Sequence, residues 1–267
     1  MCLILFANNA HPKYKLILAA NRDEFYKRPT RPAQWWEDKT DLLAGKDLEG
    51  GGTWMGISKA GRIAAVTNYR KLPVTEKYDS TRGKLVTEFL DSNISEFDYH
   101  EKMHNSRNEF DGYNLLFGNV DTIFWYSNKN PQSRQTAPTP VENGVHGLSN
   151  ELLDTPWPKV ERGKEELSAI VNKNNDIDPH ELFELLHNTD LAPDEKLPDT
   201  GIGIEFERIL SAVFIKSPDY GTRLSTVLLV DNNNKVHFEE RAFVPESITQ
   251  FTLSNLLRLF VIKLLTL

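Results

Sequence analysis

Cysteine is almost absent from this sequence. Its 267 residues include one cysteine, Cys2. One thiol cannot form an intramolecular disulfide, and it cannot supply a zinc site built from several cysteines. Because disulfides are typical of secreted proteins, this composition favours a reducing compartment, and we expect a cytoplasmic protein.

Basic side chains are outnumbered. Lysine and arginine together number 31 against 38 aspartates and glutamates, which gives a formal net charge of −7. A nucleic-acid binder needs a basic surface to neutralise phosphates, so no nucleic-acid partner is expected. The hydrophobic fraction of 39% is sufficient for a buried core, which excludes a disordered chain.

Long hydrophobic runs are missing as well. The apolar start, residues 1–7, lacks the basic region with which a secretory signal begins, and it ends early, at Asn8. It therefore predicts a buried strand instead of a secretory signal. The most apolar segment, residues 251–267, contains Arg258 and Lys263 and is shorter than the roughly 20 apolar residues of a membrane-spanning helix. It predicts a terminal helix packed on the rest of the protein or on a partner, with a helix on a membrane surface as the alternative.

Short apolar runs come in pairs joined by polar turns, as in antiparallel hairpins. The expected strands cover residues 3–7, 15–20, 53–58, 62–67, 113–118, 122–126, 225–231 and 236–241. Helical periodicity with capping residues covers 80–90, 95–107, 157–171, 179–187 and 204–212. This order of strands, helices and strands predicts an α+β fold in which helices cover antiparallel sheets.

Cys2 occupies a position that can combine a nucleophile with a base. A small residue at position 2 favours removal of Met1, and the thiol would then share its residue with a free α-amine. That amine has an ordinary pKa of about 8, so a useful fraction is unprotonated at neutral pH and can accept the thiol proton. A small buried side chain near a terminus is the alternative interpretation.

A charged cluster, Asn21-Arg22-Asp23-Glu24, ends the second strand of the first expected hairpin and so returns beside Cys2. A guanidinium there is expected to lower the pKa of the thiol, and a carboxylate is expected to hold the α-ammonium in place. A polar turn with an ordinary pair of arginine and carboxylate is the alternative.

Four segments of the chain resemble the NRDE family, which includes the transport and Golgi organisation protein of eukaryotes. These segments are residues 1–7, residues 21–25, the glycine-rich residues 50–56 and residues 220–223. The likeness extends to about Pro245. It implies one domain over residues 1–250 and leaves the apolar residues 251–267 unmatched.

NRDE proteins in turn resemble the N-terminal-nucleophile hydrolases, in particular the cysteine branch of conjugated bile salt hydrolases and penicillin V acylases. This resemblance implies a four-layer αββα sandwich with Cys2 as the nucleophile and Asp23 as the carboxylate beside it. It also implies an oxyanion-hole asparagine at Asn68, where residues 60–69 resemble the corresponding strand. The remaining site positions are a second asparagine, Asn150, and a late arginine, Arg223.

One position departs from the hydrolase pattern. That branch has an arginine three residues before its aspartate, where this chain has Ala20, and Arg22 here directly precedes Asp23. Neighbouring side chains on a strand point to opposite faces. Arg22 and Asp23 are therefore not expected to reach the thiol from the same side.

A competing motif, His100-Glu101-Lys102-Met103-His104, fits the H-E-x-x-H pattern of zinc proteases. The expected helix around it is polar on most sides, and no third ligand follows at a suitable spacing. A solvated helix face explains the motif better, and we expect neither a metal nor a cofactor.

The leading hypothesis is a hydrolase of an amide, ester or thioester bond in a small, partly apolar substrate. Cys2 attacks the carbonyl and passes its proton to its own amine, while the two asparagines hold the oxyanion. Asp23, with Arg22 or Arg223, orients that amine. The alternative is a non-catalytic carrier of haem or lipid on the same scaffold, so the partner is a small-molecule substrate or a hydrophobic ligand. Association of copies of the chain is left open.

Overall fold

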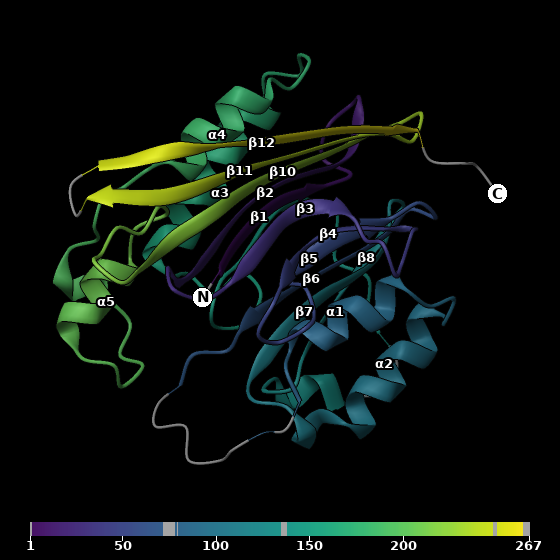
Figure 1. Cartoon of the computed structure of the whole chain (residues 1–267), viewed down its shortest axis with the longest axis horizontal. Helices are drawn as coiled ribbons and strands as arrows, with labels where there is room; N and C mark the ends of the chain where they lie inside the picture. Colours follow the sequence, from purple (N-terminus) through teal and green to yellow (C-terminus); the bar gives the residue numbers. More distant parts are fainter. Residues whose placement is uncertain (1, 72–77, 79, 135–137, 248–249, 264–267) are drawn as a thin grey trace.

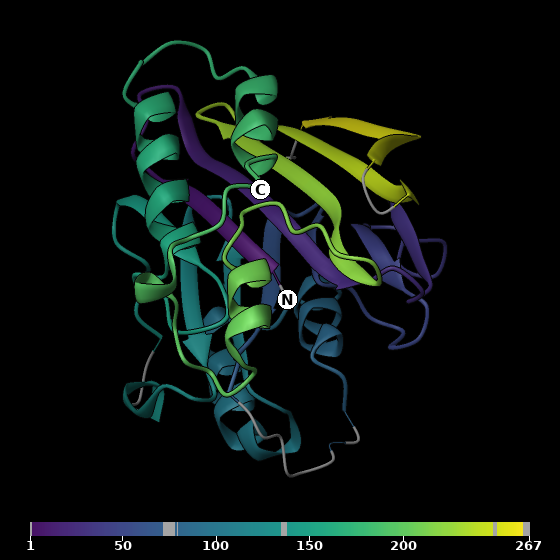
Figure 2. The same cartoon turned by 90° about the vertical axis from the view of Figure 1, so that its left-hand side faces the viewer.

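The chain forms two antiparallel β-sheets that pack face to face (Figure 1). The computed structural model describes residues 2–71, 78, 80–134, 138–247 and 250–263. Helices cover the outer face of each sheet, and Figure 2 shows this arrangement from the side. The predicted four-layer αββα sandwich is confirmed.

The first sheet, called sheet A, has the strand order β12-β11-β10-β2-β1-β9, and sheet B has the order β3-β4-β5-β6-β7-β8. The strands of sheet A are β1 (Cys2–Asn8), β2 (Tyr14–Phe25), β9 (Gly144–Leu148), β10 (Tyr220–Asp231), β11 (Lys235–Ser247) and β12 (Gln250–Lys263). The strands of sheet B are β3 (Thr30–Trp35), β4 (Leu42–Asp47), β5 (Met55–Ser58), β6 (Arg62–Asn68), β7 (Tyr113–Asn119) and β8 (Thr122–Ser127).

The five predicted helices all form. On the side of sheet B they are α1 (Gly83–Leu90) and α2 (Glu96–Asn105), and on the side of sheet A they are α3 (Pro158–Val171), α4 (Pro179–Leu186) and α5 (Ile204–Leu210). Helix α1 contacts β5, β6 and β7, whereas α3 contacts β1 and β9, and α4 contacts β2 and β10. None of the helices in the described ranges combines the length and apolar character needed to span a membrane.

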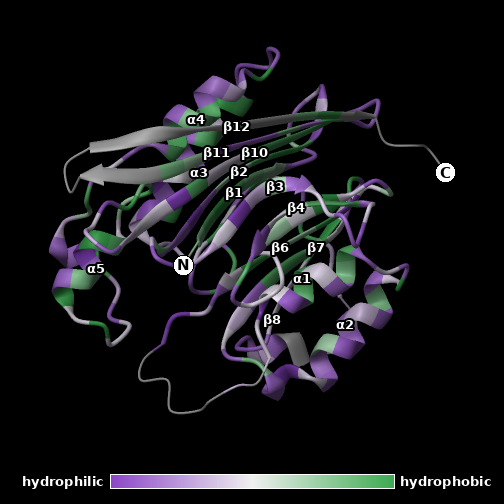
Figure 3. Ribbon diagram, in the orientation of Figure 1, coloured by the Kyte–Doolittle hydropathy of each residue, from purple (hydrophilic) through white to green (hydrophobic). Residues whose placement is uncertain are grey.

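Alternation of side chains along β1 divides the core into two parts. Ile4 and Phe6 belong to the cluster between the two sheets, whereas Leu3 and Leu5 pack beneath α3 and α4. Cys2 belongs to the first set. Because both faces of β1 are buried, the strand is apolar nearly throughout, as the hydrophobic colours of the central strands show (Figure 3).

The predicted terminal helix over residues 251–267 is wrong. Strand β12 pairs antiparallel with β11, from Gln250 opposite Ser247 to Lys263 opposite Lys235, and forms an edge of sheet A. A leucine-rich sequence favours a helix locally, but this propensity is weak, and main-chain pairing along β11 overrides it. Residues 264–267 lie outside the described part of the chain.

Consecutive glycines bring the loop after β4 against the start of α1. A Cβ atom at Gly52 would lie 2.5 Å from the carbonyl carbon and oxygen of Gly83, so the two main chains approach too closely for any other residue at position 52. The amide of Thr53 donates a hydrogen bond to the same carbonyl at 3.3 Å. This contact holds the start of α1 against the loop after β4.

Replacement of Gly52 by alanine is expected to lower the free energy of unfolding by about 1–3 kcal/mol, because the main chain at Gly83 must move. Gly50 offers a matched control, since a Cβ there would meet its nearest atoms at 3.5 Å, an ordinary contact. Gly50→Ala should change stability by less than about 1 kcal/mol. Urea unfolding of the three proteins measures the difference, and equal losses for both variants would contradict the close approach.

Candidate active site

A cavity of about 360 Å³ lies where the ends of β1 and β2 face sheet B and the glycine loop. Four of the six predicted site residues line it, and these are Cys2, Arg22, Asp23 and Asn68. The structure thus brings four of the predicted residues to one cavity, and the other two, Asn150 and Arg223, are not among the described residues that line it.

Cys2 and Arg22 lie directly opposite each other on the paired strands β1 and β2. Cross-strand partners project to the same face of a sheet, so both side chains point toward sheet B. Both are buried, with 7% of Cys2 and 5% of Arg22 exposed. Arg22 is thus the guanidinium that shares a face with the thiol.

Burial dominates the ionisation of the thiol. Burial raises the pKa of Cys2 above its ordinary value, and the carboxylates of Asp23 and Glu24 act in the same direction, while the ammonium group at the start of the chain and Arg22 lower it. Arg22 lowers the thiol pKa, as expected for a nearby guanidinium, but the cations do not offset the loss of water around the sulfur. At neutral pH the residue is a thiol and not a thiolate.

Asp23 projects to the opposite face of sheet A, toward the helices, as predicted for the neighbour of Arg22 on a strand. Oγ1 of Thr222 donates a hydrogen bond to Oδ1 of Asp23 at 2.7 Å and accepts one from the amide of Ile215 at 2.9 Å. Burial raises the pKa of the Asp23 carboxyl, and the charge of Lys159 is the strongest influence that opposes it. Asp23 is therefore a rigidly held carboxyl group beneath the start of the chain.

Asn150 and its neighbour Ser149 tie the loop after β9 to the ends of β6 and β1. Its Nδ2 donates to the main-chain carbonyl of Asn68 at 3.0 Å, and its own carbonyl accepts from the amide of Arg70 at 2.7 Å. The neighbouring Ser149 donates through Oγ to the carbonyl of Cys2 at 3.1 Å. Asn150 and Ser149 are buried, and from behind the cavity wall they hold the main chain of Asn68 and Cys2 in place.

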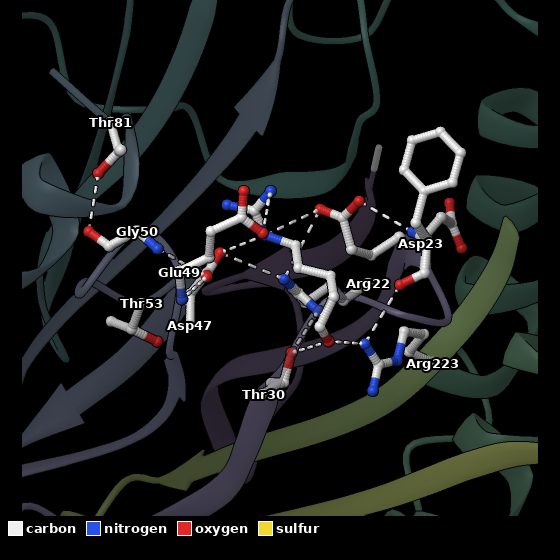
Figure 4. A network of polar contacts seen from close by, with 12 residues as sticks. Arg22, Asp23, Thr30, Asp47, Glu49, Gly50, Thr53, Thr81 and Arg223 are labelled. Atoms are coloured by element: carbon white, nitrogen blue, oxygen red, sulfur yellow. Dashed lines mark hydrogen bonds and ion pairs between the residues drawn. The ribbon is translucent and has the colours of Figure 1, made fainter. Parts of the chain in front are cut away.

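Arg223 lies at a β-bulge and holds a loop in place. The register between β10 and β2 shifts between Thr222 and Leu224, which leaves Arg223 at the irregularity. Its Nη1 donates to the carbonyls of Phe25 and Arg28, as Figure 4 shows. The sequence thus located Arg223 near the site, but its side chain fastens the loop after β2 outside the cavity wall.

Two carboxylates surround Arg22 and join it to the glycine loop (Figure 4). Nη2 of Arg22 lies 3.7 Å from Glu24 and 3.6 Å from Asp47, and Asp47 also pairs with Nε of Arg28 at 2.8 Å. Oδ1 of Asp47 accepts hydrogen bonds from two main-chain amides of the glycine loop. Sequence reasoning missed Asp47, whose only signal is its place just before the glycine-rich turn.

A buried ion pair behind the cavity was also missed. Nη2 of Arg70 lies 2.8 Å from Oε2 of Glu207, and their side chains are 7% and 3% exposed. The Arg70 guanidinium stacks over the ring of Trp157 at 4.6 Å, and Glu207 accepts two hydrogen bonds from Thr200. This pair links α5 to the segment after Asn68, and no local sequence signal connects residues so far apart in the chain.

The H-E-x-x-H segment lies on α2 and does not line the cavity. The ring of His100 packs 5.2 Å from the ring of Tyr126, so its burial has a structural explanation. Within the described ranges, no group of three or more histidine, cysteine, aspartate or glutamate side chains is placed to hold a metal ion. That this motif binds no zinc stays a prediction.

Comparison with known proteins identifies the family. The family model described as Transport and Golgi organisation 2 matches residues 1–245. The chain belongs to this family. The Transport and Golgi organization protein 2 homolog of Bos taurus is 38% identical over 270 residues, and that of Homo sapiens is 35% identical over 271 residues. Each alignment covers 94% of this chain and 96% of the relative.

A solved structure of similar arrangement is that of a mutant of the conjugated bile acid hydrolase from Clostridium perfringens. It is 9% identical to this chain, with a TM-score of 0.49, and the match covers 97% of this chain and 96% of that one. The resemblance to the NRDE family, stated above from four segments, is confirmed by the family match and the two mammalian relatives.

Breaking the buried pair behind the site should destabilise the protein. Glu207→Gln is expected to lower the free energy of unfolding by about 3 kcal/mol, because Arg70 is then left charged in a site that excludes water. Asp194→Asn is the matched control, since Asp194 pairs at the surface with Arg208 of the same helix α5, where solvent screens the pair. Urea unfolding should find that variant nearly unchanged, and a Glu207→Gln protein as stable as the wild type would contradict the assignment.

Proposed function

We propose that the mature chain begins at Cys2 and is an N-terminal cysteine hydrolase that cleaves an amide, ester or thioester bond of a small, partly apolar substrate. The observation that carries this proposal is the position of Cys2 at the open end of a central strand, opposite Arg22 and in the wall of a cavity. The α-amine freed by removal of Met1 would enter the same cavity.

The proposed reaction moves one proton within Cys2. Because burial keeps the sulfur protonated at rest, the thiol passes its proton to the neutral α-amine as the sulfur attacks the carbonyl carbon of the substrate. The bond from the acyl carbon to the leaving nitrogen, oxygen or sulfur then breaks, and the ammonium returns the proton to the leaving group. Water, activated by the same amine, releases the acid from the thioester and restores the thiol.

Asn68 is the proposed donor to the oxyanion. It ends β6 on the cavity wall, across from the strand that carries Cys2. The amide of Asn150 is engaged with the Asn68 carbonyl, so we assign Asn150 to positioning and not to direct contact with the substrate. This division of roles replaces the two equivalent donors implied by the hydrolase resemblance.

The cavity wall suits a polar substrate with an apolar part. Its cationic side chains are Arg22, Arg28, Lys46 and Arg82, and its apolar side chains include Trp54, Val66 and Leu224. Carboxylates line it as well, so the wall offers directed hydrogen bonds and not a uniform positive field.

A non-catalytic carrier of haem or lipid is the second candidate. The raised pKa of the Cys2 thiol favours it, since a protonated sulfur without a free amine beside it is a poor nucleophile. The polar cavity wall argues against a carrier, because a bound hydrophobic ligand would cover the charged side chains of the wall and remove them from water.

Protein made in a cell is expected to begin at Cys2. In this protein Arg22→Met should slow alkylation of the thiol by iodoacetamide at pH 7 about ten-fold, because a rise of one unit in the pKa of the thiol lowers the thiolate fraction by that factor. The guanidinium is the side-chain cation that lowers the thiol pKa. Lys46→Met is the matched control, because it removes another cation from the same cavity wall, and it should alkylate at the wild-type rate. Intact-mass spectrometry measures both quantities. Retention of Met1, or one rate for all three proteins, would count against the hydrolase.

Asn68→Ala should lower kcat for hydrolysis of an aryl ester about 100-fold while changing KM little, because an oxyanion donor acts mainly in the transition state. The thermal stability of this variant should match the wild type. Asn150→Ala should instead cost about 1–3 kcal/mol of stability, because buried partners lose their hydrogen bonds. A rise in KM with unchanged kcat for Asn68→Ala would contradict the oxyanion role.

A further inference from the structure

A lysine is buried beneath the start of the chain and takes no part in the reaction described above. Lys159 lies in the first turn of α3 and is 1% exposed. Its Nζ has no hydrogen-bond partner among the residues that the structure describes. Burial of an ammonium group without a hydrogen bond is costly, so its presence needs a functional or structural reason.

The first turn of α3 lies beside the start of β1. Trp157, the residue before the helix, stacks under the Arg70 guanidinium, and the Arg70 amide donates to the carbonyl of Asn150 at the Cys2 end of the sheet. Further along the helix Gly163 packs on β1, because a Cβ there would lie 2.5 Å from Cδ1 of Leu5. Helix α3 therefore follows β1 in the same direction.

Lys159 precedes Gly163 by about one helical turn, roughly 6 Å, and so lies level with Leu3. Leu3 pairs with Asn21, and Asp23 follows two residues later on the same face of β2. Lys159 and Asp23 consequently share the helix-facing side of sheet A, while the thiol of Cys2 points to the other side. The α-amine of a chain that begins at Cys2 would be a main-chain group at the end of β1, in the plane of the sheet and so between the two faces.

The titratable groups that act on Lys159 come from strands β1 and β2, helix α5 and the segment after β6. They are Asp23 of β2, Cys2 of β1, Arg70 after β6 and Glu207 of α5. Glu207 is engaged by Arg70 at 2.8 Å, so the carboxylate that remains for Lys159 is Asp23. Burial lowers the pKa of Lys159 to about 8, with Asp23 as the strongest opposing influence, so the side chain is mostly charged at neutral pH.

We propose that Lys159 is a positioning residue for the N-terminal nucleophile: its ammonium neutralises Asp23 from the helix side, so that the α-amine of Cys2 is held in place as the neutral base. This inference rests on the proposed hydrolase function. One buried carboxylate cannot stabilise two ammonium groups equally, and repulsion from Lys159 disfavours the second positive charge. The amine is therefore ready to accept the thiol proton, which a thiol with a raised pKa requires.

The single cysteine allows a direct test. In protein labelled with [15N]cysteine, the processed chain has one labelled group, the α-amine of Cys2, and its 15N chemical shift can be followed against pH after the thiol is capped as a methyl disulfide. The wild type should titrate with a midpoint below the ordinary value of about 8. Lys159→Met should raise the midpoint by one pH unit or more, and Lys159→Arg, which keeps the charge, should stay close to the wild type.

Lys164→Met is the control on the same helix, because Lys164 pairs with Asp154 at 2.7 Å near the surface, and it should leave the midpoint unchanged. A merely structural role for Lys159 would lower stability without moving the midpoint, and that result would overturn the inference. If Lys159→Met does not fold, a wild-type midpoint at or above 8 overturns it alone. A labelled signal that behaves as a peptide amide would show that Met1 is retained, in which case the hydrolase proposal fails as well.

Discussion

The antiparallel pairing of β1 with β2 is the constraint on which the site depends. It sets Cys2 opposite Arg22 and leaves Asp23 just beyond the end of β1. If β1 slipped by one residue, its side chains would change faces, and the thiol would lie among the helices, on the other side of the sheet from Arg22. The register is well determined because both faces of β1 are buried, so any slip exposes the wrong set of side chains to each core.

The two faces of sheet A divide the proposed chemistry. The face toward sheet B carries the thiol, Arg22 and the cavity, where a substrate can enter. The face toward the helices carries Asp23, with Lys159 of α3 on the same side, and both side chains are buried. A strand end is the place where groups from both faces can act on one atom, and the α-amine of a chain that begins at Cys2 would occupy that place.

Local patterns predicted much of the fold and part of the site. The first hairpin and the five helices were readable because periodicity and turn residues are local signals, whereas the αββα layers were expected from the resemblance to the N-terminal-nucleophile hydrolases. Strands β3, β4 and β9 were missed, and β12 was mistaken for a helix, because pairing with distant segments determines them. The same reason applies to Asp47, Lys159 and Glu207, whose importance arises from neighbours far away in the chain. That burial raises the pKa of Cys2 was not foreseen, because the extent of burial of a single side chain cannot be read from the sequence.

The most direct test of the account is to look for the acyl group on Cys2. The purified protein would be mixed with an activated aryl ester, quenched in acid within seconds and digested, and the N-terminal peptide analysed by mass spectrometry. The account predicts one acyl group on the thiol of chains that begin at Cys2 and none on chains that keep Met1. Absence of acylation on processed chains, or equal acylation of both forms, would contradict an N-terminal cysteine nucleophile.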